Sequence, residues 1–153
     1  MTTVEIQGFN VQGLHIRTCN ADEMQPSTAR IGPLWRDFAS EVAPRMAPAA
    51  QVYGVYHRYE SDSNGAFEVL AGTDALLQPS EDAVELSLCE IQSGSYVVFE
   101  ATGVMPQAVI DAWGRIWRYF ADPQCPHQRA YTTDFERYGT AGRIDIFIAV
   151  RAL

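Results

Sequence analysis

The chain contains one tryptophan-centred segment twice. Residues 33–39 read PLWRDFA and residues 115–121 read RIWRYFA. The two tryptophans, Trp35 and Trp117, are 117 − 35 = 82 residues apart, and the same offset matches apolar positions on either side of them. Self-similarity at a fixed offset indicates a duplicated structural unit, which limits the possible folds more than composition does.

Both tryptophan segments have the apolar spacing of amphipathic helices. Apolar residues recur three and four positions apart across 31–42 and again across 109–120, which favours two helices that each bury one face. We expect Ser27 or Thr28 to cap the first helix and Pro44 to end it, because hydroxyl side chains accept the free N–H groups of a first turn and proline cannot continue a helix.

Each predicted helix follows one β-rich run and precedes two more, which are joined by turn residues typical of hairpins. Both halves therefore read β-α-β-β. Chance similarity between two helices and two hairpins is the alternative, but the shared element order favours duplication. The expected strands are 13–18, 51–59 and 66–72 in the first half and 94–103, 129–138 and 143–150 in the second.

This repeat predicts an α+β fold in a single domain over residues 1–153, with halves at about 1–75 and 83–153. The apolar faces of two such halves are expected to pack together. We expect one antiparallel sheet with both helices on one side and a central groove between the pseudo-symmetric halves.

Charge and composition narrow the class of partner. The 153 residues are 47% hydrophobic and carry a formal net charge of −8 without a basic run, which disfavours direct nucleic-acid binding and favours cationic partners. No segment has the length of a membrane span and the N-terminus lacks the pattern of a signal peptide. The sequence thus predicts a cytoplasmic protein without membrane insertion.

Metal, cofactor and catalytic motifs are not recognisable in the sequence. The three cysteines Cys19, Cys89 and Cys125 are widely spaced, so we expect reduced thiols rather than disulfides or a zinc site. His15 and His127 do not cluster with cysteines as zinc binding or thiol catalysis requires. We therefore predict no cofactor, no metal and no assigned catalytic residue.

A glutamate in the last hairpin is the main candidate for function. If 131–138 is a regular strand, Glu136 shares one face with Asp134 and Tyr138, while Phe135 lies on the other. The residues alone leave two alternatives: a solvated carboxylate on an outer face, or a buried charge that needs a partner.

The sequence resembles the gyrase-inhibitor-like (GyrI-like) effector-binding domains, which also occur in AraC-type and MerR-type regulators. The resemblance covers about Val4 to Val150. It is carried by the duplicated order of elements, by Phe9-Asn-Val-Gln-Gly13, and by the closing FExY…IDIFIAV pattern of Phe135 to Val150. That closing pattern departs from the usual family strand at Ala149, where proline is common, and at Asp145, where glutamate is common.

The resemblance implies a ligand site with Glu136 at the base of an aromatic cavity that faces lipophilic cations. The internal repeat adds residues by symmetry, because aligning YHRY on FERY gives 136 − 57 = 79 and so matches His57 with Glu136 and Tyr59 with Tyr138. A histidine facing Glu136 would make such a site pH-sensitive. The predicted ligand-binding residues are Glu136, Tyr138, His57, Tyr59, Trp113, Tyr96, Phe147 and Glu100. Trp35 and Trp117 are predicted to be core.

Three functions are compatible with these residues. The favoured one is non-enzymatic binding of an aromatic, cationic small molecule with Glu136 as the counter-charge. The second is hydrolysis of an electrophilic small molecule, in which Glu136 activates water and Tyr138 orients it. The third is a protein-interaction module, such as a gyrase-inhibitor-like or regulator accessory protein; a homodimer or a regulator partner is compatible with each.

Overall fold

The computed structural model describes residues 2–77, 85–140 and 142–151. In these residues eight strands form a single antiparallel sheet, accompanied by three α-helices and a short 3-10 helix. The elements are β1 (Thr3–Ile6), β2 (Phe9–Thr18), α1 (Asn20–Glu23), α2 (Ile31–Glu41), η1 (Ala43–Arg45), β3 (Val52–His57), β4 (Phe67–Thr73), β5 (Ser87–Ile91), β6 (Gly94–Thr102), α3 (Gln107–Ala121), β7 (Thr133–Tyr138) and β8 (Arg143–Ala149).

The order of strands across the sheet is pseudo-symmetric. It runs β1-β6-β8-β7-β3-β4-β2-β5. If each strand of the first half is replaced by its counterpart in the second half and the reverse (β1 with β5, β2 with β6, β3 with β7, β4 with β8), the same order results, read from the other edge. Each half supplies its first strand to the edge of the other half, since β1 pairs with β6 and β5 pairs with β2. The duplication is therefore ββαββ, one strand longer per half than the β-α-β-β predicted from the sequence.

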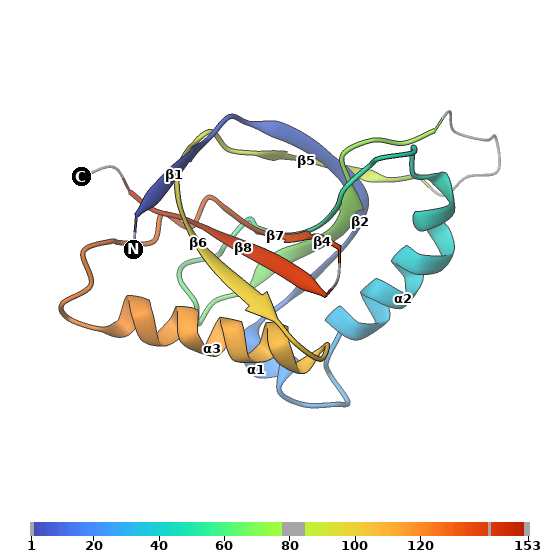
Figure 1. Cartoon of the computed structure of the whole chain (residues 1–153). Coiled ribbons are helices and arrows are strands. Elements are labelled where there is room, and N and C mark those ends of the chain that lie inside the picture. Colours follow the sequence, from blue (N-terminus) through green and yellow to red (C-terminus); the bar gives the residue numbers. More distant parts are fainter. Residues whose placement is uncertain (1, 78–84, 141, 152–153) are drawn as a thin grey trace.

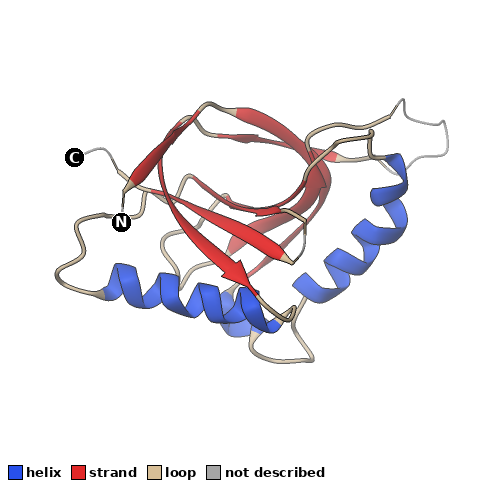
Figure 2. Cartoon of the chain, viewed as in Figure 1, coloured by secondary structure: helices blue, strands red, loops and turns tan. Residues whose placement is uncertain are grey.

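The sheet curls, and α2 and α3 both lie on its outer side (Figure 1, Figure 2). The α+β architecture with two helices on one side is confirmed. Under α2, Leu34 and Phe38 pack against β4, whereas Ile116 of α3 packs against β6 and β8. The helices thus cover separate halves of the sheet.

The opposite face of the curled sheet encloses an apolar core of its own. Its members include Tyr53, Leu70, Tyr96 and Phe135, all at most 7% exposed. Because successive strand residues point to opposite faces, β7 contributes Phe135 to this inner core and sends Glu136 toward the helices. The central strands β7 and β8 are therefore buried on both faces over most of their length, which fits the apolar run at 146–149 in β8.

The start of α2 differs from the prediction. The helix begins at Ile31, and its N-cap residue Arg30 makes no capping bond with its own side chain. Instead the Glu23 carboxylate, from α1, accepts the backbone N–H groups of Arg30 and Ile31 at 2.9 and 3.1 Å. Thr28, which we expected to cap, donates to the carbonyl of Asp22. No helix in the described residues is long and apolar enough to cross a membrane.

Candidate functional site

Glu136 is a buried carboxylate in the middle of the sheet. It lies in β7 at 1% exposure and accepts three side-chain hydrogen bonds. Tyr138 donates its hydroxyl proton to Oε1 at 2.8 Å, while Tyr56 and the indole N–H of Trp113 donate to Oε2 at 3.0 and 2.8 Å. Of the two alternatives left open by the sequence, burial is the one the structure adopts.

A glycine on the neighbouring strand makes room for this carboxylate. Register places Gly54 of β3 directly opposite Glu136. A Cβ atom at Gly54 would lie 2.8 Å from Glu136 Oε1 and 3.0 Å from Trp35 Cζ2, closer than Cβ contacts normally come. The absence of a side chain at this position therefore lets the carboxylate fold over the backbone of β3.

The Gly54–Glu136 pair lies on the pseudo-twofold axis. The offset of 82 residues that relates the two tryptophans also relates these paired residues, since 136 − 54 = 82, and it relates Tyr56 to Tyr138, since 138 − 56 = 82. Two equivalent tyrosines, one from each half, consequently donate to the two oxygens of one central carboxylate.

Aromatic rings surround the carboxylate on the helix side. The Trp35 ring meets Tyr138 at 5.0 Å between centroids, and the Trp113 ring meets Tyr56 at the same distance. These four side chains are only partly buried, and Trp117, 6.4 Å from Trp113, is 38% exposed. Glu136 is thus one layer of aromatic side chains away from solvent, between α2 and α3.

Burial controls the electrostatics of this cluster. Desolvation raises the pKa of Glu136 above its ordinary value, and the hydrogen bonds from Trp113, Tyr138 and Tyr56 oppose that rise. Burial and the neighbouring carboxylate together raise the pKa of Tyr56 and of Tyr138, so both phenols remain proton donors at neutral pH.

The Glu136 carboxylate has neutral partners only. Among the described residues, the ion pairs of arginine and histidine go to other acids, none of them to Glu136. Its three partners supply hydrogen bonds but no compensating charge. The cost of burying this carboxylate is therefore not offset by an opposite charge within the described residues.

The structure brings together three of the eight residues predicted from the sequence: Glu136, Tyr138 and Trp113. Tyr59 lies on the same face but donates to Asp134 at 2.5 Å, and Asp134 also pairs with Arg129 at 2.7 Å. This second buried acid therefore already has a cationic partner, in contrast to Glu136.

The other four predicted residues lie elsewhere. His57 contacts Cys89 and Glu68 on the opposite face of the sheet, so it does not face Glu136. Tyr96 and Phe147 belong to the inner core. Glu100 is exposed and lies 3.5 Å from Arg143.

Tyr56 was missed as a site residue because the hairpins were aligned with the wrong offset, and Trp35 was missed because it was predicted to be core. The offset of 79 differs from the offset of 82 by 82 − 79 = 3 residues, and a shift by an odd number of residues moves a side chain to the other face of the sheet. The helix offset of 82, applied to the strands, matches Tyr56 with Tyr138 and thereby identifies the second tyrosine. In the described part of the chain, no group of His, Cys, Asp or Glu side chains is arranged to hold a metal ion.

Comparison with solved structures places the fold. SAV2435, solved bound to tetraphenylphosphonium, superposes with a TM-score of 0.70 at 16% identity, covering 99% of this chain and 93% of that one. A putative transcription regulation protein from Staphylococcus aureus gives a TM-score of 0.70 at 15% identity, over 99% and 97% of the two chains. Both likenesses show that this chain shares the fold of these proteins.

The family is shown by nearer relatives. An integron cassette protein from the mobile metagenome of Vibrio cholerae is 51% identical, with a TM-score of 0.89 over 98% of this chain and 95% of that one. Residues 2–150 match the family model Cass2, described as integron-associated effector binding protein. This chain belongs to that family. A comparison with curated proteins found no match.

Proposed function

We propose that this protein binds a lipophilic aromatic cation between α2 and α3, with Glu136 as its counter-charge. The observation that carries the proposal is the state of Glu136, which is 1% exposed, holds three neutral hydrogen-bond donors and has no cationic partner among the described residues. Moving a carboxylate out of water costs several kcal/mol unless a charge compensates. A bound cation supplies that charge.

The side chains around Glu136 favour an aromatic cation over a metal ion or a small amine. Two indoles and two phenols lie close to the carboxylate, and each aromatic face attracts a cation by about 0.5 to 2 kcal/mol, depending on how dry the contact is. Flat rings also stack favourably with aromatic groups of a ligand. A diffuse charge on a large apolar molecule suits this environment, because such a cation loses little hydration when it is buried.

The fold-level likeness to SAV2435 supports the same ligand class. That protein was solved with tetraphenylphosphonium, an aromatic lipophilic cation. A change of conformation on binding would let the ligand reach the carboxylate, since partly exposed aromatic side chains now lie over it.

The test is a charge series measured by isothermal titration. Tetraphenylphosphonium, neutral triphenylphosphine oxide and anionic tetraphenylborate have similar aromatic groups and differ in charge. We expect the cation to bind wild type and Glu136→Gln to weaken it by at least tenfold, because the loss of a buried charge partner costs on the order of 2 kcal/mol or more, while the affinity for the neutral compound changes little.

Glu41→Gln is the matched control. Glu41 is an exposed carboxylate at the end of α2, so this variant makes the same change in net charge away from the aromatic cluster. Equal cation affinity in wild type and Glu136→Gln would refute the role of Glu136 as the counter-charge of the ligand. Mass analysis of the recovered compound distinguishes hydrolysis from binding. Hydrolysis changes the mass of the compound, whereas binding alone leaves it unchanged.

A further inference from the structure

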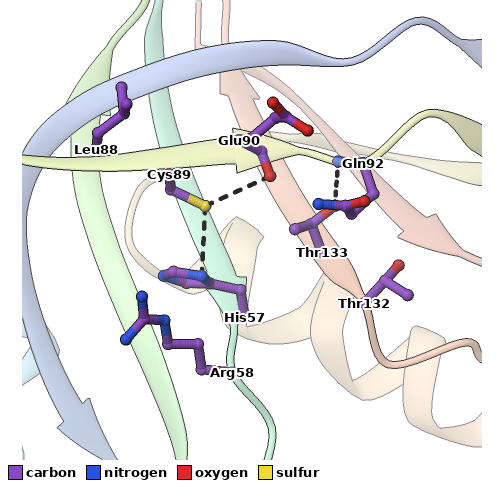
Figure 3. Close-up of a pocket in the computed structure, with 8 residues that line it drawn as sticks. All are labelled: His57, Arg58, Leu88, Cys89, Glu90, Gln92, Thr132 and Thr133. Carbon is purple, nitrogen blue, oxygen red and sulfur yellow. Dashed lines mark hydrogen bonds between the residues drawn. The ribbon is translucent and has the colours of Figure 1, made fainter.

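A second group of reactive side chains lies on the face of the sheet opposite Glu136. Cys89 of β5 and His57 of β3 are separated by β4 and β2 in the order of strands, yet the curl of the sheet brings them together. The Cys89 thiol and His57 Nδ1 are 3.3 Å apart, and Figure 3 shows the two side chains pointing toward each other.

A carboxylate lies on the side of the His57 imidazole that faces away from Cys89. Glu68 is the register partner of His57 on β4, and its Oε2 lies 3.5 Å from His57 Nε2. A proton on Nε2 is attracted by this carboxylate, which leaves Nδ1 free to accept the thiol proton. Thiol, imidazole and carboxylate thus follow in the order that nucleophilic catalysis by a Cys–His pair uses.

These side chains lie where the inner core meets a pocket, since Cys89 packs in the apolar core and also lines the pocket. The pocket has a volume of about 400 Å³, and His57 and Cys89 line it although they are only 8% and 4% exposed. The other lining residues are mainly polar, as Figure 3 shows: Arg58, Leu88, Glu90, Gln92, Thr132 and Thr133.

Two observations set this pocket apart from ordinary core packing. His57 Nε2 is buried and lacks a hydrogen bond of good geometry, which is uncommon for a polar atom. The next residue, Arg58, has a positive φ of 50°, a backbone conformation that costs free energy in a non-glycine residue and concentrates at functional sites.

We propose that Cys89 and His57 form a second site, which captures small polar α,β-unsaturated carbonyl compounds as covalent thioethers. Cys89 Sγ attacks the β-carbon, so an S–C bond forms as the C=C π bond breaks and its electrons move onto the carbonyl oxygen as an enolate. The thiol proton passes to His57 Nδ1 and from there to the α-carbon. Nothing leaves and no oxidant is consumed, so the protein gains the whole mass of the electrophile.

The charges around the pair explain why the reaction depends on His57. Burial raises the pKa of the Cys89 thiol to about 11, with Arg58 lowering it and Glu68 and Glu90 raising it. The thiolate is therefore scarce near neutral pH, and a buried thiol of this kind is inert to reagents in solution. Reaction requires a base inside the pocket.

His57 is available as that base. Burial lowers its pKa; Glu68 acts in the opposite direction, and Arg58 and His15 lower it further. The imidazole is neutral near pH 7 and can accept a proton. When it becomes charged during the step, Glu68 stabilises the imidazolium.

The experiment measures alkylation of folded protein by N-ethylmaleimide, with Cys19→Ser and Cys125→Ser removing the other thiols. Intact mass and peptide mapping report one adduct on Cys89. Between pH 7 and 9 we expect a nearly constant rate, because neutral His57 takes the proton throughout. A rate that climbs about tenfold per pH unit, as free thiolate formation requires, would overturn the proposal, as would labelling of Cys89 only after denaturation.

Variants separate proton transfer from a merely structural contact. His57→Gln is expected to lower the rate at pH 7.5 by at least tenfold, within the range of general base catalysis, and to restore the steep pH dependence. Glu68→Gln should lower the rate less and keep the shallow profile. A His57→Gln variant that is folded by circular dichroism and reacts as fast as wild type at pH 7.5 would refute the role of His57; the wild-type profile decides the case if that variant does not fold.

Discussion

At the scale of single residues, the proposed function depends on a carboxylate whose burial is offset only by hydrogen bonds. Glu136 accepts hydrogen bonds from two phenols and an indole, whereas the neighbouring buried acid, Asp134, forms an ion pair with Arg129. The contrast between these two acids on one strand distinguishes a site from a structural ion pair. The charge of Asp134 is compensated within the fold, whereas the burial of Glu136 costs stability that the proposed cation would offset.

This difference predicts an unusual dependence of stability on pH. Burial raises the pKa of Glu136 in the folded protein above the ordinary 4.5. At pH values between 4.5 and this raised pKa, Glu136 is protonated in the folded state and ionised in the unfolded state. The contribution of Glu136 to the free energy of unfolding therefore falls as pH rises above about 4.5.

Glu136→Gln lacks this titration. We expect the free energy of unfolding of the variant, relative to wild type, to increase between pH 4.5 and 7.5. Urea denaturation at several pH values measures the difference. A constant difference across this range, or one that decreases, would contradict the raised pKa.

The glycine opposite Glu136 gives a second residue-scale prediction. In Gly54→Ala the new methyl group would meet Glu136 Oε1 at 2.8 Å and Trp35 Cζ2 at 3.0 Å, so both must shift. We expect a loss of about 1 to 3 kcal/mol in stability, as for other overpacked cores, together with weaker cation binding. Gly32→Ala is a suitable control, since nothing lies near its Cβ position; equal behaviour of the two variants would show that Gly54 does not make room for the carboxylate.

At the scale of elements, the sequence predicted both long helices and both hairpins, because apolar spacing and turn residues are local signals. It missed β1 and β5, whose pairing partners lie in the other half of the chain. Nothing in a short edge segment such as Thr3–Ile6 specifies a partner some 90 residues away. The site was partly predicted for the same reason, because Glu136 and Tyr138 lie in a recognisable hairpin. The face on which His57 lies depends on the strand alignment, which the sequence comparison placed three residues out.

Edge and central strands of the sheet should differ in local stability. β1 lies at the edge of the sheet and none of its residues is buried, whereas β7 lies between β3 and β8 with four consecutive buried residues. We expect amides of β1 to exchange hydrogen through local opening and those of β7 only through global unfolding. Equal protection in the two strands, measured by NMR-detected exchange, would contradict this hierarchy.

At the scale of the whole molecule, duplication has produced a nearly symmetric frame with a single charge at its centre. Each half contributes one helix, one tryptophan at the repeat position and one tyrosine that donates to the carboxylate. Only one of the two central positions carries an acid, because Gly54 occupies the other. One carboxylate on the axis suits a ligand with one positive charge, held between the two halves.

The most direct test of this claim is the pKa of Glu136 with and without ligand. Carbon-13 NMR of the side-chain carboxyl groups, with Glu136→Gln used to assign the signal, follows the titration in free protein and in protein saturated with tetraphenylphosphonium. We predict that the pKa of Glu136 lies above 4.5 in the free protein and falls when tetraphenylphosphonium binds, because a nearby cation stabilises the carboxylate. A Glu136 pKa unchanged at saturation would show that the cation binds elsewhere.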